Sequence, residues 1–158
     1  MNDYGKIFKK QLNNRLEFQL YSYNPDKEKY FDVIKKARTQ EFKQVIINSE
    51  IMSAILYAVL TSDGVIMKIN MSDNTDEDII ENINSIVNKL RSKPILFVKL
   101  QEELGLITES GSIDIMCIEI YKFKKYFKIY SNGIVFGDDL ETFFIDFLKP
   151  VLEEYFNE

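Results

Sequence analysis

The side chains that most enzymes use for proton transfer or metal binding are scarce in this chain. Its 158 residues include no histidine, the commonest general base and metal ligand, and a single cysteine, Cys117. The six glycines lie singly, so the sequence has no glycine-rich loop of the kind that holds phosphate groups. We therefore expect a protein that is not an enzyme, with no catalytic residues, no cofactor and no bound metal.

Cys117 could act as a nucleophile only if a neighbouring base or positive charge lowered the pKa of its thiol. It stands between Met116 and Ile118, and the nearest charges in the sequence are the acidic Asp114 and Glu119. Free cysteines are among the most buried residue types. We interpret Cys117 as a small buried strand residue, and one cysteine permits no internal disulfide.

Two acidic groups have the composition of a cation site or of a pair of catalytic acids. Each precedes an apolar segment with helical spacing, and the N-terminus of a helix favours negative charge. The first group also lacks the central glycine and closing glutamate of a calcium-binding loop. We interpret both groups as helix starts; they comprise Asp73, Asp76, Glu77 and Asp78, and then Asp138, Asp139 and Glu141.

Residues 121–130 interleave five aromatic residues with four lysines, a composition typical of surfaces that stack on bases and contact phosphates. Lysines at a strand edge give the same pattern, because they protect the edge from pairing with other chains. An acidic protein or an anionic membrane is an alternative partner. The candidate partner surface combines this run with aromatic residues of the last helix: Lys122, Lys124, Lys125, Tyr126, Lys128, Phe143, Tyr155 and Phe156.

The charge of the chain is unevenly distributed. Residues 1–50 carry net charge +3 and residues 51–158 carry net charge −8, which together give −5. An acidic body repels phosphate backbones, so nucleic acid is an unfavourable partner. The longest apolar stretch, residues 51–60, is too short for a transmembrane segment, and the N-terminus lacks the pattern of a signal peptide. We expect a cytoplasmic protein.

The first half of the chain shows three patterned segments. Residues 15–20 alternate polar and apolar residues, which predicts a half-buried strand. Asn24 and Pro25 predict the start of a helix, with an apolar stripe at Tyr30, Phe31, Ile34 and Ala37. Residues 40–50 are consistent with a second short helix. Asp63-Gly64 favours a tight turn, so residues 54–62 and 65–72 are expected to form a β-hairpin.

The second half begins with a well-marked helix, with acids at its start, an apolar stripe from Ile79 to Leu90, and basic residues before Pro94. Three strands are expected at residues 95–100, 113–121 and 126–136, with a long loop at residues 101–112 and a turn or bulge at Asn132-Gly133. The last helix begins near Asp138 and should be kinked at Pro150.

These elements predict an α+β fold with a mainly antiparallel sheet flanked by helices, in the order β-α-ββ-α-βββ-α. The chain has no linker or internal repeat, and its length is typical of one domain. We therefore expect a single domain over residues 1–158, with residues 1–14 as a flexible or helical N-terminal arm.

From residue 27 to residue 157 the expected order is helix, hairpin at Asp63-Gly64, long helix, three antiparallel strands and helix. In this order the chain resembles the Roadblock family, which is close in architecture to longin and profilin domains. The resemblance implies a scaffold without enzyme activity that often forms homodimers and binds small GTPases or trafficking machinery.

A second hypothesis is an inhibitor or immunity-type protein. A small acidic protein without catalytic groups could cover the basic active site of a toxin or of a nucleic-acid enzyme, and opposite charges would speed the encounter. Under either hypothesis the partner is another protein. The sequence does not decide between them.

Overall fold

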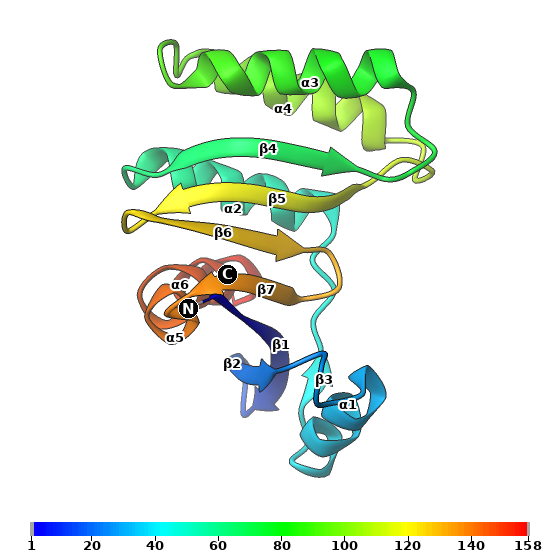
Figure 1. Cartoon of the computed structure of the whole chain (residues 1–158), viewed down its shortest axis with the longest axis vertical. Coiled ribbons are helices and arrows are strands. Elements are labelled where there is room, and N and C mark those ends of the chain that lie inside the picture. The colour runs from blue at the N-terminus through cyan, green and yellow to red at the C-terminus, as the bar shows by residue number, and fades with distance from the viewer. Residues whose placement is uncertain (1, 158) are drawn as a thin grey trace. The chain divides into compact units, whose positions relative to one another are not determined.

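The computed structural model describes residues 2–157 (Figure 1). The contacts within the chain divide it into two compact units. Unit 1 comprises residues 1–47 and 132–158, and unit 2 comprises residues 48–131. Every strand pairing within each unit is antiparallel. Helices accompany the strands in both units, which confirms the predicted α+β class. The single domain over residues 1–158 stays a prediction.

Unit 1 contains a sheet with the strand order β2-β1-β7, and a short strand β3 that also pairs with β1. One helix follows β2, and a second helical segment ends the chain. The elements are β1 (Asn2–Leu12), β2 (Arg15–Tyr23), α1 (Tyr30–Thr39), β3 (Lys43–Gln44), β7 (Ile134–Asp138), α5 (Leu140–Phe143), the π-helical turn η1 (Phe144–Leu148) and α6 (Lys149–Phe156).

Strand β1 contradicts the expected N-terminal arm, whereas β2 confirms the predicted strand. A two-residue turn joins the strands, with Asn13 at a φ of 53°, a conformation that asparagine tolerates. Strand β1 has partners on both sides, and the consecutive residues Lys6, Ile7 and Phe8 are all buried. A strand buried on both faces loses the alternation by which strands are recognised in a sequence.

Helix α1 starts at Tyr30, later than expected, because Asn24 organises a turn instead of a helix. The side chain of Asn24 accepts a hydrogen bond from the N–H of Asp26, and its carbonyl accepts from Lys27 and Glu28. Phe31 was placed on the apolar stripe, but it is 71% exposed. The short helix expected at residues 40–50 is also wrong, since this segment contains β3.

The predicted last helix is confirmed, with one irregularity at its centre. In η1 the N–H of Lys149 donates to the carbonyl of Phe144, five residues earlier. Pro150 follows directly and has no N–H to donate to Asp146, so the regular pattern of hydrogen bonds cannot continue through this point. The π-helical turn accommodates the missing hydrogen bond at the position where a kink was predicted.

Unit 2 contains a sheet with the order β6-β5-β4 and three helices. Helix α2 contacts β4 and β5, and helix α3 contacts β4 and α4. The elements are α2 (Ser49–Thr61), β4 (Val65–Met71), α3 (Glu77–Leu90), α4 (Leu96–Thr108), β5 (Ile115–Lys122) and β6 (Lys125–Tyr130).

The hairpin expected around Asp63-Gly64 is wrong in its first half, which is helix α2. The side chain of Asn48 caps this helix by accepting a hydrogen bond from the N–H of Ile51 at 2.9 Å. The turn joins a helix to a strand, because the N–H of Gly64 donates to the carbonyl of Val59 at 2.8 Å. The buried residues follow helical spacing: Ile51, Met52, Ile55, Leu56 and Val59.

The strand expected at residues 95–100 is also wrong, since helix α4 covers it together with most of the expected loop at residues 101–112. Phe97, Leu100 and Leu104 are buried at the spacing of one helix face. A short apolar run is compatible with either structure. Helix α3 and strand β5 are confirmed, and Asn132-Gly133 forms the turn before β7.

Strand β4 lies at the edge of the unit 2 sheet, and the side chain of Asn84 closes that edge. Asn84 accepts a hydrogen bond from the N–H of Ile69 at 3.0 Å and donates to the carbonyl of Ile69 at 3.1 Å. It also donates to the carbonyl of Ile80 within α3. One side chain therefore satisfies both outward backbone groups of Ile69, as a neighbouring strand would.

Replacing Asn84 with alanine should reduce the free energy of unfolding by about 1–3 kcal/mol, because the backbone groups of Ile69 lose their partners. Urea unfolding followed by circular dichroism measures this change. Asn88→Ala on the exposed side of the same helix is the control and should change stability by less than about 0.5 kcal/mol. Equal effects of the two substitutions would contradict the assigned role of Asn84.

Candidate functional site

Cys117 has the environment of a structural residue. It is buried, and its thiol donates to the carbonyl of Ile118 at a sulfur–oxygen distance of 3.7 Å. Burial raises the pKa of the thiol to about 11, partly offset by a hydrogen bond with Asn70. Because the thiolate is the nucleophilic form, Cys117 is poorly suited to covalent chemistry at neutral pH.

Lys6 is the most unusual charged residue of unit 1, because it is fully buried. Its ammonium group donates to the carbonyl of Asn132 and lies 5.0 Å from the ring centre of Tyr30. Burial lowers its pKa to about 8. The adjacent Gly133 has a φ of +85°, and a Cβ there would lie 2.8 Å from the carbonyl oxygen of Val45. Lys6 therefore holds this tight turn and is not accessible to a substrate.

The two acidic groups mark helix starts, as expected. Helix α3 begins directly after Asp76, and α5 begins directly after Asp139. Among residues 2–157, no three carboxylate or thiol side chains come close enough together to hold a metal ion.

The sheet of unit 2 has one face with accessible side chains, formed by two cross-strand rows. The first row places Val65, Tyr121 and Tyr126 side by side, and the second places Lys68, Glu119 and Lys128 side by side. Tyr121 is 42% exposed and Tyr126 is 36% exposed. We call these six residues the tyrosine face. The opposite face carries the buried pairs Ile66–Ile120 and Ile69–Ile118.

Glu119 organises the centre of the tyrosine face. Its carboxylate accepts a hydrogen bond from the side-chain amide of Asn70 at 2.6 Å and another from the hydroxyl of Tyr126. Lys68 and Lys128 lie opposite it on the neighbouring strands. The hydrogen bonds hold Tyr126 in one orientation, so part of this surface is ordered before any partner arrives.

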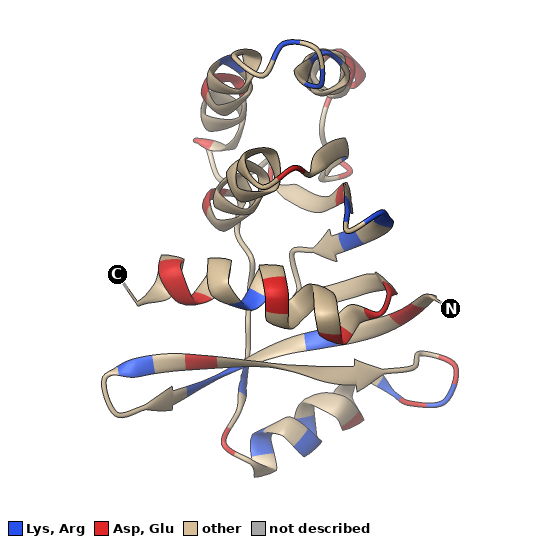
Figure 2. Cartoon of the chain, turned by 90° about the vertical axis from the view of Figure 1, so that its left-hand side faces the viewer, with Lys and Arg blue, Asp and Glu red and all other residues tan. Residues whose placement is uncertain are grey.

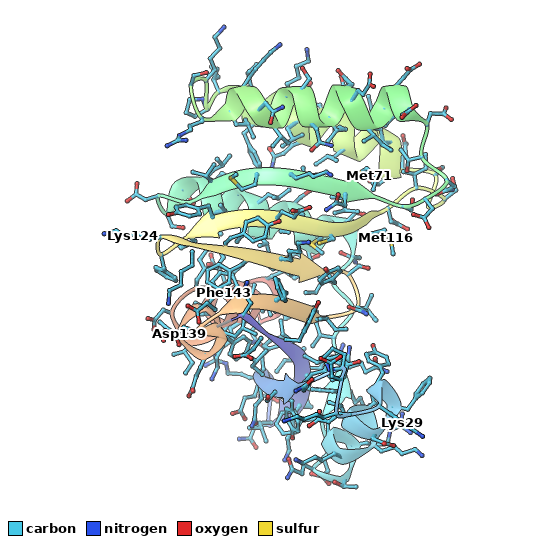
Figure 3. All side chains as sticks on the ribbon, viewed as in Figure 1. Lys29, Met71, Met116, Lys124, Asp139 and Phe143 are labelled. Atoms are coloured by element: carbon cyan, nitrogen blue, oxygen red, sulfur yellow. The ribbon has the colours of Figure 1, made fainter. Side chains whose placement is uncertain are left out.

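The residues of the predicted partner surface belong to both units, and two of them are buried. Lys124 occupies the tip of the β5–β6 hairpin (Figure 3), and Lys125, Tyr126 and Lys128 lie on β6. Lys122 is buried, and its ammonium group donates to the carbonyl of Ser62. That residue therefore cannot belong to an accessible surface of the folded chain.

The aromatic residues of the predicted surface belong to unit 1. Phe143 is buried, with its ring centre 5.5 Å from that of Phe147, so it is not accessible either. Phe156 is half-buried against Phe18 at 5.3 Å, and Tyr155 is half-buried beside it. Sequence reasoning left out Tyr121, whose place opposite Tyr126 depends on the register of β5 and β6.

Unit 1 contains two grooves that the sequence did not predict. One, of about 640 Å³, lies along the β1–β2 hairpin and α5–η1. The other, of about 910 Å³, combines four basic residues with an apolar floor, and only Glu41 opposes that charge. The basic residues are Lys9, Lys10, Arg38 and Lys43; the floor is Leu16, Ile34 and Phe42. In the sequence, the one indication of the second groove was the net positive charge of residues 1–50.

No protein-family model, curated protein or solved structure matches this chain. The resemblance to the Roadblock family relied on an element order that included the Asp63-Gly64 hairpin, where the structure has helix α2. That resemblance stays a prediction. Within residues 2–157, every helix is too short or too polar to cross a membrane.

The buried charge of Lys6 makes stability depend on pH. The folded chain releases this proton near pH 8, whereas the unfolded chain retains it until about pH 10.5. Between these values the unfolded state binds more protons, so the free energy of unfolding should rise with pH across this window. Lys6→Met should remove that rise, and urea unfolding at pH 7.5, 8.5 and 9.5 measures it. Lys99→Met, at an exposed position, is the control and should retain the rise.

Proposed function

We propose that this chain is a non-catalytic protein-binding module and that it contacts a partner through the tyrosine face. The observation that carries the proposal is the exposed Tyr121–Tyr126 pair beside a charged row of fixed geometry. Tyrosine is enriched at protein interfaces because it combines apolar contact area with a polar group and has few rotatable bonds.

Further apolar side chains extend this surface around the β5–β6 turn and along β4. Phe123 at the turn is 45% exposed, and Met67 on β4 is 48% exposed. Accessible aromatic and methionine side chains next to a charged row are typical of interfaces with an apolar centre and a polar rim. The shortage of catalytic groups in the sequence is consistent with a binding role.

The class of partner follows from the two earlier hypotheses, and both remain proposals. The Roadblock resemblance favours a scaffold for small GTPases, and the net charge of −5 favours an inhibitor that captures a basic toxin or nucleic-acid enzyme. The tyrosine face carries two lysines and one glutamate, so its charge does not favour a strongly basic partner. The acidic residues that would favour the inhibitor hypothesis lie elsewhere on the chain.

A photo-crosslinking amino acid at position 126, introduced in the source cells, should yield a covalent adduct with one specific protein. The same amino acid at Phe31, which is also exposed but lies in unit 1, is the control and should not yield that adduct.

Tyr121→Ser combined with Lys128→Glu should weaken binding of the captured protein by about 10–100-fold, the loss expected from an interface centre. Glu81→Lys on α3 should leave it unchanged. Undiminished binding by the double variant would refute the proposal.

A further inference from the structure

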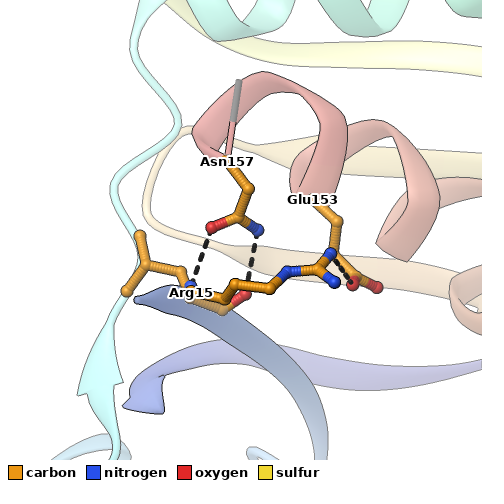
Figure 4. Close-up of polar contacts among 4 residues, drawn as sticks. Arg15, Glu153 and Asn157 are labelled. Carbon is orange, nitrogen blue, oxygen red and sulfur yellow. Dashed lines mark hydrogen bonds and ion pairs between the residues drawn. The ribbon is translucent and has the colours of Figure 1, made fainter. Parts of the chain in front are cut away.

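Strand β2 is an edge strand of the unit 1 sheet, and part of its outer edge is open. The side chain of Asn157 accepts a hydrogen bond from the N–H of Leu16 at 2.8 Å and donates to the carbonyl of Leu16 at 3.1 Å (Figure 4). The backbone groups of Leu16 therefore point away from β1. Because backbone direction alternates along a strand, those of Phe18, Leu20 and Ser22 point the same way.

Beyond Phe18, no segment among residues 2–157 pairs with this edge. Strand β2 pairs only with β1, in a register that runs from Tyr4–Tyr23 to Leu12–Arg15. Within the described part of the chain, no hydrogen bond reaches the outward backbone groups of Phe18, Leu20 or Ser22. Phe18 is only 1% exposed and lies under Phe156, so its backbone is not accessible to a partner. Leu20 and Ser22 are the two outward positions whose donors and acceptors another strand could pair with.

The groove of about 640 Å³ includes the open part of this edge and extends over β1 at Asp3, Tyr4 and Gly5. It includes five residues of β2, from Glu17 to Ser22, and continues onto α5 and η1. Helix α6 packs on β2 at the other end, where Phe156 meets Phe18. Part of the helical wall is apolar, formed by Leu140, Phe144 and Ile145, and Ile145 is 52% exposed. The groove therefore has a hydrogen-bonding side and a side that can receive apolar side chains.

The charge of this groove is strongly negative. It contains four carboxylates and a single lysine, Lys149. The acidic residues come from both walls, and those of the C-terminal helical segment appear in red in Figure 2. They are Asp3 and Glu17 on the strands and Asp139 and Glu141 at the start of α5.

We propose that an extended basic segment of another protein adds to β2 as a further strand in this groove. The backbone of the segment would pair with Leu20 and Ser22, which supplies affinity without regard to sequence. Alternate side chains would contact Leu140, Phe144 and Ile145. Lysine or arginine at the remaining positions would meet the carboxylates, which supplies specificity for a basic sequence.

Asn157 and Phe156 set the end of the added strand. The amide of Asn157 already occupies the position beside Leu16 that a longer segment would take. Phe156 covers the next outward position, Phe18, so the segment pairs from Leu20 to Ser22, a distance of about 7 Å at about 3.3 Å per residue. This length corresponds to about three paired residues of the partner.

The same charges argue against the other occupants of an open edge. Two copies of this chain joined edge to edge would bring like acidic groups together, which is unfavourable. A nucleic acid would meet the same repulsion. Of these three occupants, a basic segment is the one that can both pair with the backbone of β2 and complement the negative charge of the groove.

The test uses the full-length protein and a phage-displayed library of random eight-residue peptides. Enriched peptides should be rich in lysine or arginine alternating with apolar residues. Bound peptide should slow hydrogen exchange at the amides of Leu20 and Ser22, measured by nuclear magnetic resonance. Acidic enriched peptides, no enrichment at all, or binding that leaves these two amides unprotected would each overturn the proposal.

A matched pair of variants separates backbone pairing from other effects. Ser22→Pro removes one outward N–H at an exposed position of an edge strand, where proline is tolerated, and should weaken the selected peptide at least about tenfold. Ser22→Ala keeps that N–H and should bind normally. Equal binding by the two variants would exclude strand addition. Urea unfolding of both variants checks that the fold is retained.

A second pair tests the charge. Glu141→Lys should weaken the peptide about tenfold at low salt, whereas Glu81→Lys on α3 should not. The inference is independent of the tyrosine face: Tyr121→Ser combined with Lys128→Glu should leave peptide binding intact. Loss of peptide binding in that double variant, or an unchanged affinity in Glu141→Lys, would count against the site.

Discussion

The hydrogen-bonding groups of an edge strand must be satisfied by another part of the chain or left to water or a partner. In this protein, asparagine side chains perform part of that task in both units. Asn84 pairs with Ile69 on β4, and Asn157 pairs with Leu16 on β2. A carboxamide carries one acceptor and an N–H donor in the same arrangement as a peptide unit, so it can replace one residue of a neighbouring strand. Asn84 lies in helix α3 and Asn157 directly follows helix α6, so each bond pair also fixes a helix against its sheet.

The two edges differ in how far this closure extends. On β4, helix α3 lies along the strand and its buried residues, Ile83, Ile86, Val87 and Leu90, fix it in place. On β2, helix α6 and the following Asn157 contact Arg15, Leu16 and Phe18, at one end of the strand. The π-helical turn lies between α5 and α6 and brings Phe144 and Ile145 to the groove. Such turns occur often at functional sites because they reorient side chains without ending the helix.

The sequence predicted the elements whose local pattern agrees with their surroundings. Residues 15–20 alternate in polarity because alternate side chains face the core: Phe18 is buried and Gln19 is exposed. Helix α3 has an apolar stripe, an acidic first turn and a basic last turn. Prediction from the sequence failed where an element is buried on several sides, because such an element shows no polar–apolar periodicity. Residues 54–62 and 95–100 are short apolar runs that fit either structure, and β1 is buried on both faces. Nothing in the sequence marked Lys6 as buried, since lysine is rarely found in a core.

The candidate surfaces depend on contacts between residues that are far apart in the sequence. The tyrosine face needs the register of three strands, and a shift of one residue would send Tyr121 to the buried side. The acidic groove joins residues 3–22 to residues 139–149, so no window of sequence contains both walls. Composition indicated only the absence of catalytic groups. In a chain with so few groups for chemistry, the positions of backbone hydrogen-bonding groups and of ordinary charges carry the functional information, and only the fold places them together.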